Sequence, residues 1–255
     1  MARQESLVKF KGKIGNLSFY KTKDGYLARM KGGPSKEQIK SDPRFLRTRE
    51  NGSEFGRAAN VGIMLREQLR PVLVQGADVT FSNRLTGLLN RVLRADEVNG
   101  RGDRQIIASN LGVLTGMECN VRAKLSEVFY SQARPVYDSD TAETTLELPE
   151  MIAKNQIKAL QGATHVQVLL AVTEFDSTRQ EVNGLSIVRS SYLDIGRSDP
   201  SPAQVLHAQQ EDLPQPGTAL LVLMGVSYFQ FVSGGYYPLA NGQYNALTFV
   251  QVIQS

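Results

Sequence analysis

The sequence predicts an α+β protein with an N-terminal β-meander, a helical middle segment and a C-terminal antiparallel β-sandwich. Three observations predict it. Polar and apolar side chains alternate over residues 9–31, and apolar side chains recur at helical spacing over residues 43–95. After residue 127, β-branched and aromatic residues are separated by turn signals. We therefore divide the chain into a basic β-meander or arm (1–34), a mainly helical segment (35–126) and a β-sandwich domain (127–255).

The opening segment has the alternation of a narrow ribbon of strands. Lys9, Lys11 and Lys13 fall on one face of the first expected strand, while Phe10 and Ile14 fall on the other. A later Asp-Gly pair suits a tight hairpin, because glycine tolerates a positive φ. A ribbon of this size is only marginally stable in water by itself. We therefore expect it to pack against the rest of its chain, a nucleic acid or a second copy.

Three helices are expected in the middle segment. Asp42-Pro43 suits the start of the first, since aspartate caps a helix and proline is tolerated in its first turn. Asn51-Gly52-Ser53 predicts a break and a new start, and Pro71 should stop or kink the second helix. The third should follow Ser82. Residues 106–114 fit either a helix or a strand.

The C-terminal part is expected to hold about six antiparallel strands. The strand candidates are 128–130, 144–148, 165–175, 185–195, 219–232 and 244–253. Asn183-Gly184 is expected to be a turn, and the proline-rich stretch Asp199 to Gly217 a long surface loop. The run from Ala219 to Met224 is apolar at every position, which predicts a central strand buried on both faces.

Charge is distributed unevenly along the chain. The net charge of the whole is +4, but residues 1–50 hold 13 Lys/Arg against 5 Asp/Glu, whereas residues 135–255 hold 5 against 12. A basic head and an acidic tail favour contact between the two, within one molecule or between molecules. The acidic half fits poorly with a simple coat on nucleic acid, because it would repel phosphate.

Composition and motifs narrow the class of protein. The single cysteine, Cys119, allows no intrachain disulfide. No signal peptide or membrane-length apolar run is recognised, so a cytoplasmic protein is the default expectation, with signal-independent export or association with a particle left open. The chain carries no phosphate-binding, dinucleotide-binding or HExxH motif. No cofactor, metal or small-molecule substrate is therefore expected.

These observations predict a non-enzymatic structural protein that self-assembles as the subunit of a filament, ring or particle. Its basic ribbon would dock on the acidic body of the next copy, partly by adding a strand to an exposed sheet edge. The candidate docking residues are Lys9, Lys11, Lys13, Phe19, Tyr20, Lys21 and Tyr26.

Two rival functions stay open. The first is nucleic-acid binding by the basic N-terminal half, with Arg84, Arg91 and Arg94 on the third expected helix along the phosphate backbone. The second is catalysis, for which His165, His207 and Cys119 are the most obvious residues. Neither rival is accompanied by a recognition or catalytic motif.

The opening also resembles a known family. "KGKIGNLSFYKTKDGYLARMKGG" followed by "DPRFLRTRENGSEFGRA" is similar to the start of a family of uncharacterised bacterial proteins of comparable length, with the pattern KGxIGxxxFYKxxDGYLAR. The resemblance covers about the first 70 residues well and the remainder only in general pattern. It implies a compact, basic N-terminal module, and it implies nothing about an activity or a site.

Overall fold

The computed structural model describes residues 2–30, 32–210 and 213–254. The chain forms two compact units, Met1–Arg49 and Glu50–Ser255. The expected α+β class is confirmed: strands come first, helices occupy the middle and antiparallel sheets follow. The division between the units follows Arg49, whereas the sequence suggested boundaries after residues 34 and 126. The second unit contains both the helical segment and the β-rich part.

Unit 1 is an antiparallel sheet followed by short helices. Its strands, in the spatial order β1-β4-β3-β2, are β1 (Ala2–Arg3), β2 (Gly12–Ile14), β3 (Leu17–Thr22) and β4 (Gly25–Met30). The expected three-stranded meander is therefore present, and β1 adds a fourth strand beside β4. Helix α1 (Lys36–Ser41) begins with a capping box between Ser35 and Gln38, and the 3₁₀ turn η1 (Pro43–Phe45) follows Asp42.

The predicted break at Asn51-Gly52-Ser53 is wrong. Helix α2 (Leu46–Gln68) runs through these residues without interruption. The next residue, Glu54, is buried, and its carboxylate accepts a hydrogen bond from the Gly102 backbone N–H at 2.8 Å. We attribute the continuous helix to such tertiary contacts, which outweigh the modest helix-breaking preference of one glycine. Helix α2 stops before Pro71, as expected, and Pro71 lies in the first turn of the next helix, α3 (Arg70–Gly76), which α4 (Phe81–Arg94) follows.

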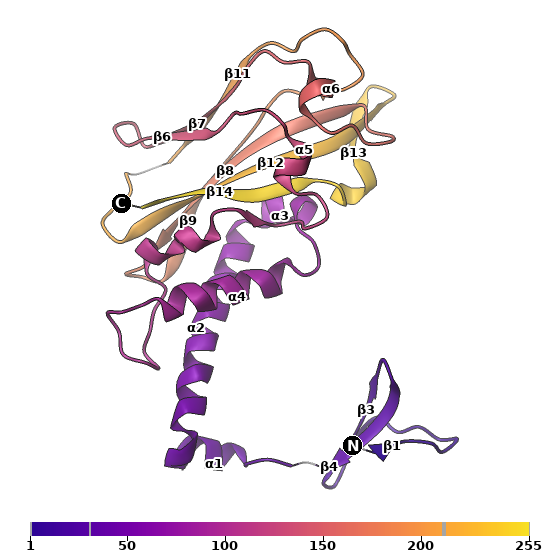
Figure 1. Cartoon of the computed structure of the whole chain (residues 1–255), viewed down its shortest axis with the longest axis vertical. Helices are drawn as coiled ribbons and strands as arrows, with labels where there is room; N and C mark the ends of the chain where they lie inside the picture. The colour runs from indigo at the N-terminus through magenta and orange to yellow at the C-terminus, as the bar shows by residue number, and fades with distance from the viewer. Residues whose placement is uncertain (1, 31, 211–212, 255) are drawn as a thin grey trace. The chain divides into compact units, whose positions relative to one another are not determined.

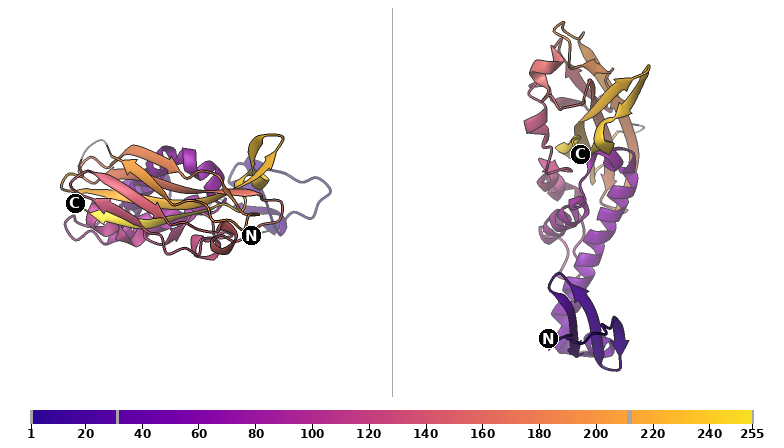
Figure 2. Two further views of the ribbon diagram at one scale, coloured as in Figure 1. Left: turned by 90° about the horizontal axis from the view of Figure 1, so that it is seen from above. Right: turned by 90° about the vertical axis from the view of Figure 1, so that its right-hand side faces the viewer.

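Unit 2 is built on a seven-stranded antiparallel sheet with β12 at its centre. Its strands are β5 (Met117–Glu118), β8 (His165–Asp176), β9 (Glu181–Arg189), β10 (Leu193–Asp194), β12 (Thr218–Val232), β13 (Gly235–Pro238) and β14 (Ala246–Gln254). Strand β12 pairs with β8 on one side and with β14 on the other. The β12–β13 hairpin extends beyond the body of the sheet (Figure 2).

A second sheet of three strands covers one face of the first. It has the order β11-β7-β6 and consists of β6 (Pro135–Asp138), β7 (Glu143–Leu148) and β11 (Gln204–Gln209). Helices α3 and α4 lie under the opposite face of the large sheet, so unit 2 has three layers (Figure 1). The two sheets form the expected sandwich, and the helices add a layer to it.

Alternating side chains of β12 enter two different cores. Leu220, Val222 and Met224 pack against the three-stranded sheet, in the core that also holds Leu146 and Leu206. The intervening residues, Ala219, Leu221 and Leu223, pack in the core that the helices share. The prediction of a central strand buried on both faces is confirmed, because every residue of this run is at most 1% exposed.

Three other local predictions are wrong. Residues Leu125–Val128 form the short helix α5, and Phe129 makes only an isolated bridge to Ile157, where a strand was expected. Asn183-Gly184 lies within β9 and makes no turn. The expected loop after Asp199 contains β11, whose alternation places Leu206 and Ala208 in the core. The proline-rich flanks obscured this six-residue strand in the sequence.

The remaining elements are short. They are the 3₁₀ turn η2 (Ala108–Leu114), helix α6 (Ala153–Gln156) and the 3₁₀ turn η3 (Leu239–Gly242). Within the described ranges, no helix combines the length and the apolar character needed to cross a bilayer.

The core between the large sheet and the helices gives a prediction about stability. Leu221 is completely buried, so Leu221→Ala should lower the free energy of unfolding by about 2–5 kcal/mol through lost contacts and a residual cavity. Val98→Ala, at a side chain 83% exposed, should change it by less than about 0.5 kcal/mol. Urea unfolding followed by circular dichroism measures both. Equal effects of the two substitutions would contradict the assignment of Leu221 to the core.

Candidate functional site

The sheet of unit 1 has one apolar face that stays largely exposed, although Phe10 packs on Phe19 with 5.7 Å between the ring centroids. Cross-strand pairing places Ile14, Leu17 and Met30 on this face, together with Phe19 and Ala28. Ile14 is 59% exposed, Leu17 41% and Met30 72%. None of the described residues of unit 1 is buried within the unit. The residues of both hydrophobic cores belong to unit 2. The sheet therefore has the amphipathic pattern of a packed layer without a core beneath it.

The opposite face of the same sheet is basic. Lys13 pairs across the strands with Ser18, and Ser18 pairs with Arg29, so all three side chains share this face. Arg29 lies over the ring of Tyr20, with 5.5 Å between the guanidinium carbon and the ring centroid. Such a contact holds the cation over the ring while leaving its charge available to a partner.

The predicted docking residues divide between these two faces. Phe19, Lys21 and Tyr26 are on the apolar face, and the Lys21 ammonium lies 5.5 Å from the centroid of the Tyr26 ring. Lys13 and Tyr20 are on the basic face. Lys9 and Lys11 precede β2, outside the sheet ladder, and the Lys9 ammonium donates to the Gln4 carbonyl.

Sequence reasoning missed the apolar members of this surface. It marked the lysines and aromatic residues, but Leu17 and Met30 were not among its candidates. The signal was available, because they flank a hairpin whose pairing register follows from the Asp-Gly turn. In the loop before β2, Leu7 and Val8 are also exposed, at 105% and 61%.

The outer face of the three-stranded sheet is acidic. Thr144, Leu146 and Leu148 of β7 point inward and are buried, so Glu143 and Glu147 point outward. Strand β6 adds Asp138 to the same face. The other outward residues of these strands are Val136, Thr145, Val205, His207 and Gln209. No lysine or arginine belongs to the three strands.

Two carboxylates of this face lie directly opposite each other. Asp138 pairs with Glu143 across β6 and β7, and like charges in such a pair are destabilising. Glu143 gains one partner, His207, whose Nδ1 lies 3.0 Å from Oε1. The pKa of Asp138 is lowered by hydrogen bonds from the backbone N–H of Asp140 and from Thr141, so this carboxyl stays charged at neutral pH. The face thus keeps a negative charge that a cation from outside the sheet could offset.

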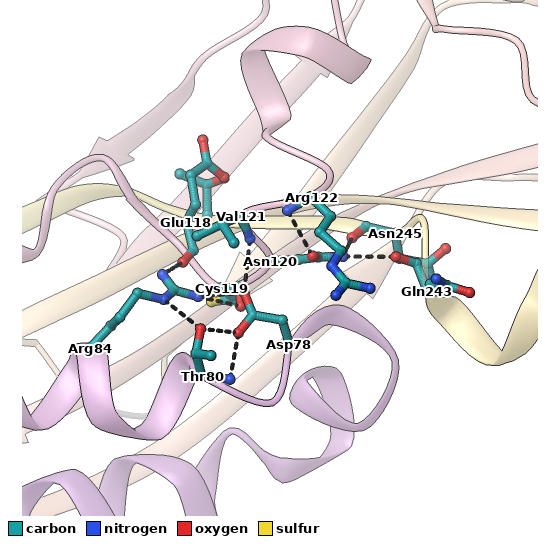
Figure 3. Close-up of polar contacts among 11 residues, drawn as sticks. Asp78, Thr80, Arg84, Glu118, Cys119, Asn120, Val121, Arg122, Gln243 and Asn245 are labelled. Atoms are coloured by element: carbon teal, nitrogen blue, oxygen red, sulfur yellow. Dashed lines mark hydrogen bonds and ion pairs between the residues drawn. The ribbon is translucent and has the colours of Figure 1, made fainter. Parts of the chain in front are cut away.

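The arginines of α4 that were predicted to contact nucleic acid differ in their surroundings. Arg84 is engaged with its own unit: it pairs with Asp78 at 2.7 Å and donates to the backbone carbonyls of Glu118 and Cys119 (Figure 3). It holds the start of α4 to the β5 segment. Arg91 and Arg94 are exposed, and their expected contact with nucleic acid stays a prediction.

The catalytic candidates are not brought together as a nucleophile and base. Cys119 is completely buried, and this burial raises the pKa of its thiol, which therefore stays protonated. His207 pairs with Glu143, while His165 lies among aromatic rings, 5.0 Å from the ring of Tyr236. Among the described residues, no group of three or more His, Cys, Asp or Glu is arranged to hold a metal ion.

Comparison with known proteins adds no family. The chain matches no protein-family model and no curated protein. The resemblance of the opening residues to a bacterial family therefore stays an expectation. What the chain can do must be argued from the two charged surfaces and their geometry.

The Asp78 contacts predict a pH-dependent contribution to stability. Partial burial acts to raise the pKa of Asp78, but hydrogen bonds from Thr80 and Val121 and the charge of Arg84 lower it to about 2. A depressed pKa stabilises the fold above the unfolded value of 3.8 and loses that effect as pH falls toward 2. Asp78→Asn should therefore cost about 2 kcal/mol at pH 7.

Urea unfolding of wild type and Asp78→Asn between pH 7 and pH 2 measures this contribution. The difference between the two proteins should shrink as pH falls from about 5 to 2. Asp199→Asn, at an exposed aspartate, should match wild type throughout. A difference between wild type and Asp78→Asn that is independent of pH would contradict the ionic role of Asp78.

Proposed function

We propose that this chain is a structural subunit that self-associates, with the N-terminal sheet of one copy docking on the three-stranded sheet of the next. One observation carries the proposal: unit 1 has formed strands and an apolar face, yet none of its described residues is buried in a core. Burial of exposed apolar surface is the main favourable term in association. A small sheet gains stability when its hydrophobic face packs against another element.

Charge complementarity supports this choice of partner surface. Residues 2–30 hold seven Lys/Arg against two Asp/Glu. The outer face of the three-stranded sheet presents Asp138, Glu143 and Glu147 without a compensating lysine or arginine in its strands. A lysine beside Asp138 and Glu143 would turn a repulsive cross-strand pair into an attractive group of three. Complementary potentials of this kind also select the right partner and speed the encounter.

The strand edges favour a specific mode of contact. Strand β2, of three residues, and strand β6, of four, are each at the end of their sheet order. Antiparallel or parallel pairing of these edges would satisfy free backbone groups on both. If Lys13 shares a face with Asp138, then Ile14 shares the other face with Tyr137, because side chains alternate along each strand. The basic face would thereby continue the acidic face, and apolar side chains would lie together behind it.

The proposed contact joins two different surfaces. A head-to-tail contact of this type builds a closed ring if the rotation between copies closes, and a filament if it does not. A ring and a filament would both bring the basic N-terminal part of one copy to the acidic C-terminal part of the next.

A charge exchange between the two surfaces tests the proposal. Lys13→Glu and Asp138→Lys, each made alone, should weaken self-association roughly three- to ten-fold, because each replaces an attraction by a repulsion. The two substitutions combined in one chain should restore it, since the pair is attractive again with its signs reversed. Light scattering after size-exclusion chromatography, over a range of protein concentrations, measures the association.

Lys23→Glu is the matched control. It removes the same charge from the same unit but lies in the β3–β4 turn, away from the β2 edge, and should have little effect. A wild-type chain that stays monomeric at every concentration would refute self-association. Failure of the double variant to regain association would refute the pairing of β2 with β6. Salt-sensitive binding of duplex DNA by a strictly monomeric chain would favour the rival function instead.

A further inference from the structure

A cavity of about 380 Å³ opens on unit 2 beside the turn between α3 and α4. Its lining includes Val74, Val79, Val121, Arg122 and Gly242. The volume falls at the lower end of the range for small-molecule sites, about 300–1,000 Å³. The cavity belongs neither to the N-terminal sheet nor to the acidic face, so it is independent of the self-association surfaces.

Close packing fixes the walls of this cavity. Gly242 has a φ of +82°, and a Cβ at this position would collide with the Gln75 carbonyl oxygen. Only glycine therefore allows the η3 turn to lie against the end of α3. On the neighbouring wall, the buried Asn120 side chain donates hydrogen bonds of 3.0 Å to the carbonyls of Gln243 and Asn245 (Figure 3). The cavity is thus formed before any ligand arrives.

Apolar side chains are exposed around the cavity. Val74 is 70% exposed, Val79 97% and Val121 47%. Single exposed valines are ordinary on a protein surface, but these three come from separate segments and line the same hollow. An aliphatic chain lying between them would remove apolar area from water on both sides.

Arg122 brings to the cavity a positive charge that no described carboxylate pairs with. The Asp78 carboxylate is already met by Arg84 at 2.7 Å and by the backbone N–H groups of Thr80 and Val121. No carboxylate among the described residues forms an ion pair with Arg122. Figure 3 draws the Arg122 guanidinium between Asp78 and Gln243, which line the same cavity. Its planar fork matches the two oxygens of a carboxylate.

From these features we infer that the cavity binds a small aliphatic monocarboxylate, with its chain between the valines and its carboxylate on Arg122. Octanoate is a suitable probe, and octan-1-ol has the same chain without the charge. Isothermal titration of the full-length protein should show saturable binding of octanoate and at least ten-fold weaker binding of octan-1-ol.

Variants at the cavity separate the two parts of the site. Arg122→Gln should weaken octanoate binding ten-fold or more, equivalent to about 1.4 kcal/mol. Val79→Asp should abolish it, because the new carboxylate repels the ligand and interrupts the apolar wall. Both side chains are exposed, so both variants should keep the thermal midpoint of wild type. Arg189→Gln, at an exposed arginine of β9, is the matched control and should bind like wild type.

Three results would overturn the inference. The first is the absence of saturable octanoate binding to the wild-type protein. The second is equal affinity of Arg122→Gln and Arg189→Gln for octanoate, and the third is octan-1-ol binding as tightly as octanoate. None of these readouts depends on the oligomeric state, so failure here and failure of the proposed self-association are distinguishable.

Discussion

The burial of β12 on both faces is the constraint on which the rest of the structure depends. A strand with apolar side chains on both sides cannot lie at a surface, so each face needs its own covering layer. The helices supply one layer and the three-stranded sheet supplies the other. Strand β12 also pairs with β8 and β14 along most of its length, which satisfies its backbone groups on both edges. The two hydrophobic cores of unit 2 lie on the two sides of this strand.

Unit 1 presents the opposite situation. It has regular pairing and clear alternation, but Ile14, Leu17 and Met30 of its apolar face stay exposed, and none of its described residues is buried. The same physical rule that assembles unit 2 therefore directs unit 1 toward a surface outside itself. All the buried residues of both hydrophobic cores belong to unit 2.

Some charged side chains of unit 2 pair with each other inside the unit, and others do not pair with a charge of opposite sign from Lys, Arg, Asp or Glu among the described residues. Asp78 and Arg84 form a well-connected pair that ties the start of α4 to the β5 segment, and their charges are used internally. Asp138 and Glu143 instead face each other across two strands, and Arg122 lies beside a preformed cavity without an ion-pair partner among the described residues. Neither Asp138 nor Glu143 has a lysine or arginine beside it in the three strands, so their charges remain available to a cation from outside the sheet.

The sequence by itself determined the α+β class, the meander around the Asp-Gly turn, the stop of α2 before Pro71 and the double burial of β12. Each depends on local pattern or on side-chain chemistry that a neighbouring contact does not change. Only the tertiary structure decided that α2 continues through Gly52, that a strand lies between the prolines before Gly217, and that Arg84 pairs with Asp78. The cavity beside Arg122 and the acidic face also arise from segments far apart in the chain. Their contacts are set by long-range packing, and a one-dimensional pattern does not encode which distant segments meet.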